Sequence, residues 1–369
     1  MNKASLFLGL FIAMMQALSY AAPSPDKFKS ALSGYHYAFP KDHAAHEEYR
    51  TEWWYYTGHL QAADGRTFGY QLTFFRSGMD HPSLAANPSR WAIQHLYLAH
   101  FAITDEGDKR FFNTDKVNRT GIGNAGAETA PYHIWNGSWM VKTVQSIHHI
   151  VASENEWAID LMLTPRKPPV IHGQDGISKK GKGPTQSSHY YSLTSMETRG
   201  TVKVSGRTLK VKGTSWMDHE FGSNQLSEDQ IGWDWFGLQL DSGIELMLYQ
   251  IRRKDGSLDP FSSGTVVSEN GSSKHLVLSD FQIKAKGLWK SNKSGGNYPN
   301  GWEISIPNQD ISLILTPTVP DQELITTRST GVTYWEGSVI IQGTHHGRPM
   351  TGKGYVELTG YAESLRKKF

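Results

Sequence analysis

Residues 51–76 read TEWWYYTGHLQAADGRTFGYQLTFFR, and this stretch decides the fold class. Its two runs alternate between residues suited to opposite faces, a period typical of β-strands with one buried face. The dipeptide Asp64-Gly65 between them is a signal for a two-residue hairpin turn. That turn would set the antiparallel register of the two strands. The predicted cross-strand pairs are Trp53 with Arg76, Tyr55 with Phe74, and His59 with Tyr70.

A second hairpin is predicted at residues 232–253. There, GWDWFGLQL and IELMLYQIRR flank a short DSG tripeptide. A three-residue loop at this tripeptide pairs Trp233 with Ile251 and Trp235 with Tyr249. A register error of one residue would move every one of these side chains to the other face, so the loop length decides which aromatic rings share a face.

The two hairpins resemble each other, and the resemblance continues along the chain in the same order. The matched segments are DLMLTP (160–165) with SLILTP (312–317), GTVKVSG (200–206) with GSVIIQG (337–343), and GTSWMDHEFG (213–222) with GKGYVELTG (352–360). Ordered self-similarity of this kind is typical of an internal duplication. The sequence therefore predicts an all-β protein with two related antiparallel β-domains at 45–225 and 230–369, each a curled sheet or barrel.

Composition narrows the class of protein. The chain has 369 residues, with 37 Lys and Arg against 35 Asp and Glu, evenly scattered, so no basic stripe predicts nucleic-acid binding. After the N-terminal segment, no apolar run is long enough to predict a transmembrane helix. The twelve Trp, sixteen Tyr and fifteen Phe, with 36 Gly, are typical of a β-rich protein whose strands line a cavity or pack an aromatic core.

The first residues predict export. A short positive start at Lys3 precedes an apolar stretch, 6–15, that is too short to span a bilayer. Ser19 and Ala21 supply the small residues of a signal-peptidase site, so residues 1–21 are predicted to be a cleaved signal peptide. The chain has no cysteine and therefore no thiol for lipid attachment or disulfides. The predicted location is periplasmic or secreted, as a soluble protein.

The segment SWMDHEF holds the candidate acid–base residues Asp218, His219 and Glu220. In an alternating strand, Asp218 and Glu220 share one face with Trp216, while His219 points away together with Phe221. A carboxyl group in an apolar pocket keeps its proton near neutral pH and can act as an acid. The alternative is a structural corner, because the matched repeat carries a carboxylate, Glu357, at the position of Asp218.

Other chemistries find little support in the motifs. No H-E-x-x-H or similar spacing predicts a metal site, although Asp, His and Glu are ligand types. No G-x-S-x-G and no cysteine supply a nucleophile for acyl transfer. The Gly-x-Gly runs lie in hairpins and precede no helix, so they do not predict nucleotide binding. No metal and no cofactor are predicted.

Seven motifs in order resemble the AttH-like family, a group often labelled predicted secreted hydrolases and related to carotenoid 1,2-hydratase (hydroxyneurosporene synthase). The motifs are YRTEWWYYTGHL, FGYQLTFFR, GISKKG, WMDHEFGS, GWDWFGLQL, YWEGSV and GKGYVELTGY. The resemblance implies two lipocalin-like β-barrel domains. It also implies a link to transport, because genes of this family often neighbour membrane-transporter permeases.

The resemblance also suggests an activity. Carotenoid hydratases add water across an isolated double bond without a cofactor, using His and Trp of a DHxW-like motif with Tyr and Asp of a later strand. In this chain Asp218, His219 and Tyr249 match that pattern. Phe221 stands where the family has Trp, and Ile251 where it has the acid, so another carboxyl group would have to serve for hydration.

Three functions remain open from the sequence. The first is an exported protein that binds an apolar lipid- or isoprenoid-like molecule in a lipocalin-like cavity. The second is a cofactor-independent enzyme, a hydratase (a carbon–oxygen lyase) or a hydrolase, that acts on such a ligand. The third is an envelope protein that partners a membrane transporter. The candidate catalytic residues are His219, Asp218, Glu220 and Tyr249, and the candidate ligand-binding residues are Trp53, Tyr55, Trp216, Phe221, Trp233 and Trp235.

Overall fold

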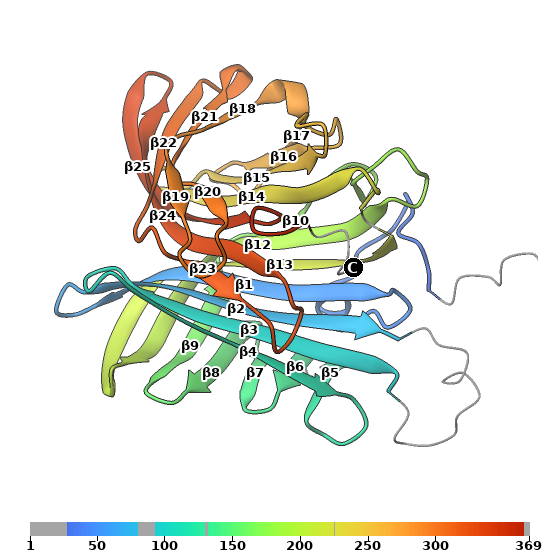
Figure 1. Cartoon of the computed structure of the whole chain (residues 1–369), viewed down its shortest axis with the longest axis vertical. Helices are drawn as coiled ribbons and strands as arrows, with labels where there is room; N and C mark the ends of the chain where they lie inside the picture. The colour runs from blue at the N-terminus through green and yellow to red at the C-terminus, as the bar shows by residue number, and fades with distance from the viewer. Residues whose placement is uncertain (1–27, 80–92, 130–131, 225, 365–369) are drawn as a thin grey trace, which may run out of the picture.

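A computed structural model describes residues 28–79, 93–129, 132–224 and 226–364. The described chain is almost entirely β-structure, which confirms the predicted fold class (Figure 1). Three short 3-10 helices, η1 (Lys41–His43), η2 (Leu278–Asp280) and η3 (Pro307–Gln309), interrupt it. In the described residues, no helix is long and apolar enough to cross a membrane. The predicted signal peptide, residues 1–21, lies outside the described residues.

The first sheet comes from the N-terminal half of the chain. Across the sheet the strands are β4 (Arg110–Arg119), β3 (His95–Asp105), β2 (Thr67–Gly78), β1 (Thr51–Ala62), β13 (Arg207–Asn224), β12 (Ser187–Val204), β9 (Trp157–Pro165), β8 (Ile147–Glu154), β7 (Trp139–Val144), β6 (Tyr132–Asn136) and β5 (Ala125–Thr129), with β10 (Val170–Ile171) and β11 (Ser178–Lys179) also paired to β12. Asn118 of β4 donates to Asn136 of β6 at 2.7 Å, so the sheet curls until its two edges meet.

The second sheet comes from the C-terminal half and lies above the first in Figure 1. Its strands are, in order, β17 (Ser273–Val277), β16 (Ser263–Val267), β15 (Glu245–Arg253), β14 (Gln230–Leu240), β25 (Arg348–Leu358), β24 (Thr333–His345), β22 (Ile311–Pro317), β21 (Trp302–Ile306) and β18 (Gln282–Ala285), with β23 (Glu323–Ile325) paired to β24. The short strands β19 (Leu288–Lys290) and β20 (Asn297–Pro299) pair separately.

The two sheets repeat one strand order. The run β3-β2-β1-β13-β12-β9-β8 in the first sheet corresponds to β16-β15-β14-β25-β24-β22-β21 in the second. The segments matched in the sequence fall on corresponding strands: 160–165 on β9 and 312–317 on β22, and 213–222 on β13 and 352–360 on β25 and the residues after it. This agreement supports the internal duplication that we propose from the sequence.

The register of the first hairpin differs from the prediction. Thr73 faces Tyr55, and Arg76 faces Glu52 rather than Trp53. The reason is the turn. The Ala62 N–H donates a hydrogen bond to the Arg66 carbonyl and so closes a three-residue loop, in which Gly65 adopts a φ of 88° that favours glycine. One extra loop residue shifts all cross-strand pairs. The second hairpin has the predicted register, with Trp235 opposite Tyr249 and Trp233 opposite Ile251.

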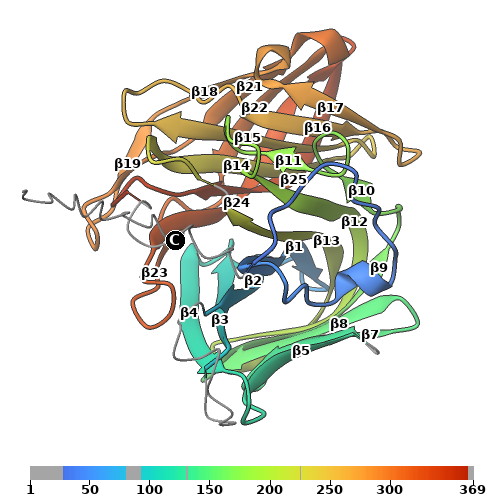
Figure 2. The ribbon, with the colours of Figure 1, turned by 90° about the vertical axis from the view of Figure 1, so that its right-hand side faces the viewer.

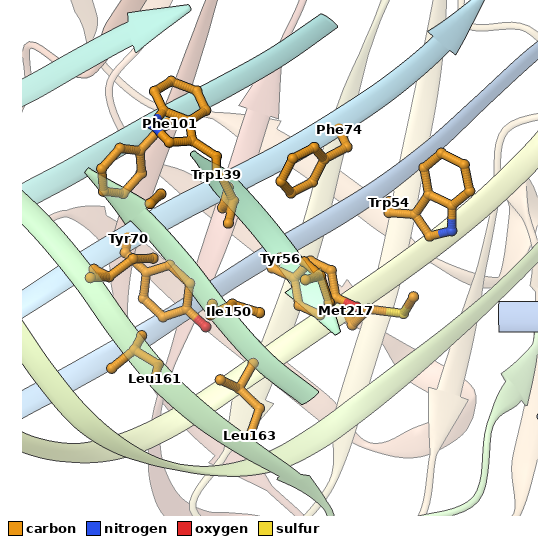
Figure 3. Packing of buried hydrophobic residues seen from close by; sticks show 14 of the residues in the cluster. Trp54, Tyr56, Tyr70, Phe74, Phe101, Trp139, Ile150, Leu161, Leu163 and Met217 are labelled. Atoms are coloured by element: carbon orange, nitrogen blue, oxygen red, sulfur yellow. The ribbon is translucent and has the colours of Figure 1, made fainter. Parts of the chain in front are cut away.

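Each sheet encloses a core of its own. Figure 3 shows the first core, where aromatic and aliphatic side chains from β1, β2, β3, β7, β8, β9 and β13 point inward. Its labelled members are Trp54, Tyr56, Tyr70, Phe74, Phe101, Trp139, Ile150, Leu161, Leu163 and Met217. The second core includes Phe236, Trp302 and Trp335. At roughly 1.5–3 kcal/mol for each large apolar side chain, burial in these cores dominates the stabilisation of the fold.

A third apolar cluster joins the two sheets. It brings together the outward-facing side chains Tyr55, Tyr190, Trp216, Trp235, Met247, Tyr249, Ile251 and Tyr355. Strands β1 and β25, β2 and β24, and β12 and β14 contact one another across this interface (Figures 1 and 2). The strands at the contact are therefore buried on both faces, which explains why 51–76 contains so few exposed residues.

Candidate functional site

A cavity of about 520 Å³ lies between the two sheets. Its walls come from the outward faces of β1, β2, β12 and β13 on one side and of β14, β15, β24 and β25 on the other. Aromatic and carboxyl side chains that line it include Trp53, Tyr55, Phe75, Tyr190, Asp218, Glu220, Trp233, Trp235, Tyr249, Tyr334 and Glu357. A volume of this size suits a small organic molecule rather than a single ion.

The cavity is built from matching positions of the two sheets. Asp218 pairs with Tyr55 across β13 and β1, and Glu357 pairs with Trp235 across β25 and β14. When Asp218 and Glu357 are taken as equivalent positions, the cross-strand registers match further residues of the two sheets, and both members of every matched pair given below line the cavity. The pairs are Asp218 and Glu357, Tyr55 and Trp235, Trp53 and Trp233, Thr73 and Tyr249, Phe75 and Ile251, Tyr190 and Tyr334, and Glu220 and Thr359. The site thus has an approximate two-fold arrangement.

Asp218 is the carboxyl group on the first wall. Its oxygens accept hydrogen bonds from Tyr190 (2.7 Å), from the indole of Trp216 (2.6 Å) and from Ser192. Burial raises the pKa of Asp218 to about 7, although these three donors act in the opposite direction. At neutral pH the group therefore exchanges readily between its acid and its carboxylate form.

Glu357 is its counterpart on the second wall. Burial raises the pKa of Glu357 to about 7 as well, against a hydrogen bond from the indole of Trp233. Glu336 lies directly opposite on β24 and accepts a hydrogen bond from Tyr55 at 2.7 Å. Burial and the neighbouring Glu357 raise the pKa of Glu336 well above its usual range. Two carboxyl groups in one dry site cannot both ionise, so the pair holds a proton at neutral pH.

Glu220 occupies one end of the cavity beside Lys180. The Lys180 ammonium lies 3.2 Å from Glu220, and Ser188 donates to the same carboxylate at 2.5 Å. Burial would lower the pKa of Lys180, but the Glu220 carboxylate raises it above its usual value. The ammonium also lies 4.2 Å from the ring centre of Tyr249. This end of the cavity therefore carries an ion pair, whereas Asp218 and Glu357, the other two carboxyl groups described above as cavity residues, have raised pKa values.

Indole and phenol groups connect the two walls. The rings of Tyr55 and Trp235 meet edge to face, with centroids 5.2 Å apart. The indole of Trp235 donates to the hydroxyl of Tyr190 at 3.0 Å, which in turn donates to Asp218. The predicted ligand-binding residue Trp216 does not line the cavity itself. Its indole donates a hydrogen bond to Asp218, which does. The predicted ligand-binding residues Trp53, Tyr55, Trp233 and Trp235 all line the cavity.

His219 and Phe221 lie on the opposite face of β13, away from the cavity. His219 is fully buried inside the first sheet, where its Nε2 is 2.8 Å from Glu52 and its Nδ1 is 3.1 Å from the Tyr191 hydroxyl. Phe221 stacks on the ring of His46. The candidate residues His219 and Phe221 therefore do not line the cavity, in agreement with the alternation of side chains along β13.

Glu52 organises the polar group around His219. Arg76 lies 2.9 Å from Glu52, and His46 lies 2.8 Å from it. Burial would raise the pKa of Glu52, but the charge of Arg76 and the histidine hydrogen bonds hold it well below its usual range. His46, Glu52 and His219 offer ligand-type atoms within 4.8 Å of one another. The guanidinium on the same carboxylate makes this group an ion-pair network rather than a favourable place for a cation.

Several residues of the site were not predicted from the sequence. Glu336 and Tyr334 belong to the YWEGSV motif, and Lys180 belongs to GISKKG. The repeat matches Asp218 with Glu357, but the sequence leaves open whether that match marks a site or a structural corner. The repeat match of the neighbouring strands could not find the pair Tyr190 and Tyr334, because it aligns Gly200 with Gly337, whereas the strand registers align Gly200 with Gly343.

The arrangement can move protons beside aromatic side chains. Two carboxyl groups titrate near neutral pH on opposing walls, and the indole and phenol faces between them can stabilise a carbocation. Two curled antiparallel sheets of this kind define a lipocalin-like fold.

Comparison with known proteins identifies the family of this chain. The chain belongs to the AttH-like family, whose model matches residues 30–361. The crystal structure of a protein described as AttH from Nitrosomonas europaea is 31% identical and superposes with a TM-score of 0.81, over 90% of this chain and all of that one.

Two further comparisons are with kievitone hydratases. The chain is 25% identical over 190 residues to kievitone hydratase from Fusarium solani subsp. phaseoli, a match to 49% of this chain and 53% of that protein. This chain thus spans about half the length of that relative. The crystal structure of kievitone hydratase from Nectria haematococca shares the fold, with a TM-score of 0.69 at 17% identity over 91% of this chain and 98% of that one.

Proposed function

We propose that this chain is a cofactor-independent enzyme of the hydratase type, a carbon–oxygen lyase that acts on a largely apolar small molecule in the cavity between the sheets. One observation carries the proposal: Asp218 and Glu357, with pKa values raised to about 7, occupy matching positions on opposite walls of an aromatic cavity. The sequence relation to a hydratase supports the same reaction class.

The two carboxyl groups take different roles because their partners differ. Glu357 faces Glu336, whose pKa is raised well above its usual range, and the pair keeps at least one proton at neutral pH. Glu357 is the member of the pair that lines the cavity, so we assign it as the acid that protonates one carbon of the double bond. The neighbouring carbon becomes a cation, which the rings of Trp233 and Trp235 stabilise.

Asp218 is the base in this scheme. Its three neutral donors favour the carboxylate form, which accepts a proton from the attacking water as the new carbon–oxygen bond forms. The acid has then lost one proton and the base has gained one, and exchange with solvent restores both groups. The reverse sequence removes water from the product alcohol.

The proposal assigns His219 no contact with the substrate. Its place in the Glu52 network makes it a residue that stabilises the first sheet next to β13. Tyr249 remains a cavity residue, because it lines the wall beside Lys180. Glu220 also remains, as the partner of Lys180 rather than as the acid.

Labelled water tests the reaction. The purified protein is incubated in isotopically labelled water with a panel of trisubstituted alkenes attached to aromatic rings, and products are measured by mass spectrometry. We expect a product that has gained one labelled water, and its loss in both Asp218→Asn and Glu357→Gln. A reaction that survives in both variants would contradict the assignment, as would a panel that yields no product.

A binding function without turnover is the second candidate. The aromatic walls favour it, since they would hold an apolar ligand whether or not it reacts. In that case mass spectrometry of the extracted protein would show a co-purifying lipid or isoprenoid that Asp218→Asn retains unchanged. Export and a membrane-transporter partner, both predicted from the sequence, are compatible with the enzyme and with the binding protein. We propose cleavage after Ala21, which the mass of the exported protein tests.

A further inference from the structure

The cavity departs from its two-fold arrangement at one end. Glu220 on the first wall matches Thr359 on the second. Beside Glu220, the connection 166–186 between β9 and β12 brings Lys180 to the cavity. The corresponding connection of the second sheet, 318–332, lines the cavity with Thr330 and Val332 instead. A symmetric cavity would bind a ligand equally well in two opposite orientations. Because only one end carries Lys180 and Glu220, the two orientations of a ligand differ in their contacts.

Lys180 and Glu220 form a paired donor and acceptor in the cavity wall. Both side chains are at least nine-tenths buried, and their charged atoms lie 3.2 Å apart. The ammonium also lies over the rings of Tyr249, at 4.2 Å, and Tyr190, at 5.3 Å. The pair is neutral as a whole and so gives a carboxylate ligand no net attraction, and Arg50, the other cationic side chain that lines the cavity among the described residues, is exposed to solvent.

A hydroxyl group satisfies both members of the pair. Its oxygen accepts a hydrogen bond from the Lys180 ammonium, and its hydrogen is donated to the Glu220 carboxylate. We infer that the ligand of this cavity is an apolar molecule with a hydroxyl group at one end, phenolic or alcoholic, which binds between Lys180 and Glu220. This inference rests on the proposed function, because it names the substrate class of the same site.

The location of the pair also sets the direction of the substrate. Trp53 faces Glu220 across β1 and β13, so an apolar body attached to the hydroxyl extends along the aromatic walls toward Asp218. Asp218 and Glu220 lie two residues apart on one face of β13, about 7 Å along the strand. The double bond would therefore lie a few carbon atoms from the hydroxyl group.

Two matched probes test the inference. 2-Naphthol carries the hydroxyl, and 2-methoxynaphthalene replaces its hydrogen by a methyl group. Calorimetric titration should show that the wild-type protein binds 2-naphthol at least about tenfold more tightly, since sites that hydrogen-bond a hydroxyl discriminate strongly against its absence. Equal affinities, or no binding of 2-naphthol, would overturn the inference.

Variants locate the preference. The double variant Lys180→Met with Glu220→Met removes both charges and every side-chain hydrogen-bonding group of the pair, so it should bind both probes with equal affinity. Lys210→Met changes an exposed lysine on the same sheet and should keep the preference. A preference that survives the double variant, with a thermal unfolding midpoint like that of the wild type, would overturn the inference.

The test also separates the inference from the proposed reaction. Probe selectivity depends on Lys180 and Glu220, whereas water addition depends on Asp218 and Glu357. If the probes are discriminated but no alkene gains water, the hydroxyl anchor stands and the hydratase proposal fails. If alkenes gain water without any preference for a hydroxyl, the anchor fails and the reaction stands.

Discussion

Glu52 and Asp218 are both buried carboxyl groups, and they lie on opposite faces of the first sheet, but their electrostatic environments have opposite effects. Glu52 faces inward beside Arg76, His46 and His219, and its pKa lies well below the usual range. Asp218 faces the cavity, and burial raises its pKa to about 7. Similar burial therefore leads to an ionised group on one face and a readily protonated group on the other.

The charge of the partners makes the difference. Glu52 receives hydrogen bonds from a guanidinium and two imidazoles, whereas Asp218 receives them from hydroxyls and an indole. Neutral donors offset only part of the desolvation of a carboxylate, but a cation at 2.9 Å more than offsets it. The first arrangement suits a structural role, and the second suits proton transfer.

Glu52→Gln should produce the largest effect. The substitution leaves Arg76 and its neighbouring histidines buried beside a neutral amide, and an uncompensated buried charge costs about 3–5 kcal/mol of unfolding free energy. Urea unfolding followed by tryptophan fluorescence measures this loss. Asp218→Asn is the matched control on the other face. If the control lost more stability than Glu52→Gln, the contrast between the two faces would be wrong.

His219→Ala should produce the next largest effect. The variant loses the ring that stacks on Trp54 and bonds Glu52 and Tyr191, so we expect a loss of about 2–4 kcal/mol. Affinity for 2-naphthol should stay within a factor of about two, since His219 does not line the cavity. Lost binding with unchanged stability would be the reverse outcome, and it would restore His219 to the site.

The two faces should also respond oppositely to pH. The folded pKa values of Asp218 and Glu357 exceed their unfolded values, so the folded state binds more protons between about pH 4 and 7. Their contribution to stability is greatest at low pH and falls by up to about 1.4 kcal/mol per pH unit for each group as pH rises through this window.

Glu52 has the opposite sign, because its pKa is depressed in the folded state. Its contribution is present above the unfolded pKa and is lost as pH falls below it. Urea midpoints measured from pH 4 to 8 test the sign for Asp218 and Glu357 when the wild type is compared with Asp218→Asn/Glu357→Gln. The double variant should show the shallower decline toward neutral pH. Identical profiles would show that neither carboxyl group has a raised pKa.

Much of the fold could be predicted from local sequence patterns. Alternation, hairpin signals and the ordered repeat predicted an all-β chain, and the DSG loop gave the correct register around Trp235. The register around Trp53 was missed by one residue, because Asp64-Gly65 fits both a two-residue turn and the end of a three-residue loop. Local preference cannot choose between turns that differ by one residue, whereas packing on both faces of β1 can.

The site was harder to predict because it lies between the sheets. Alternation correctly separated Asp218 from His219, yet nothing local indicates which face meets the second sheet. Asp218 was therefore a candidate site residue on the sequence evidence, but Glu336 and Tyr334 were not, since they lie more than one hundred residues away in the chain. The duplication was the usable signal, since matched carboxylates on equivalent strands can face each other when the sheets pack together.

Asp218→Asn at pH 5 should have the smallest effect on stability. At that pH the wild-type carboxyl group is largely protonated, since its pKa is about 7. A protonated carboxyl and an amide present the same groups to their partners: one oxygen accepts from Ser192 and Trp216, and the other atom can donate to Tyr190. We therefore expect a change below about 1 kcal/mol in the urea unfolding free energy, while Glu52→Gln remains strongly destabilised at the same pH. A large loss for Asp218→Asn at pH 5 would mean that Asp218 is ionised and structural, as Glu52 is, and the acid–base role would have to be assigned to Glu357 alone.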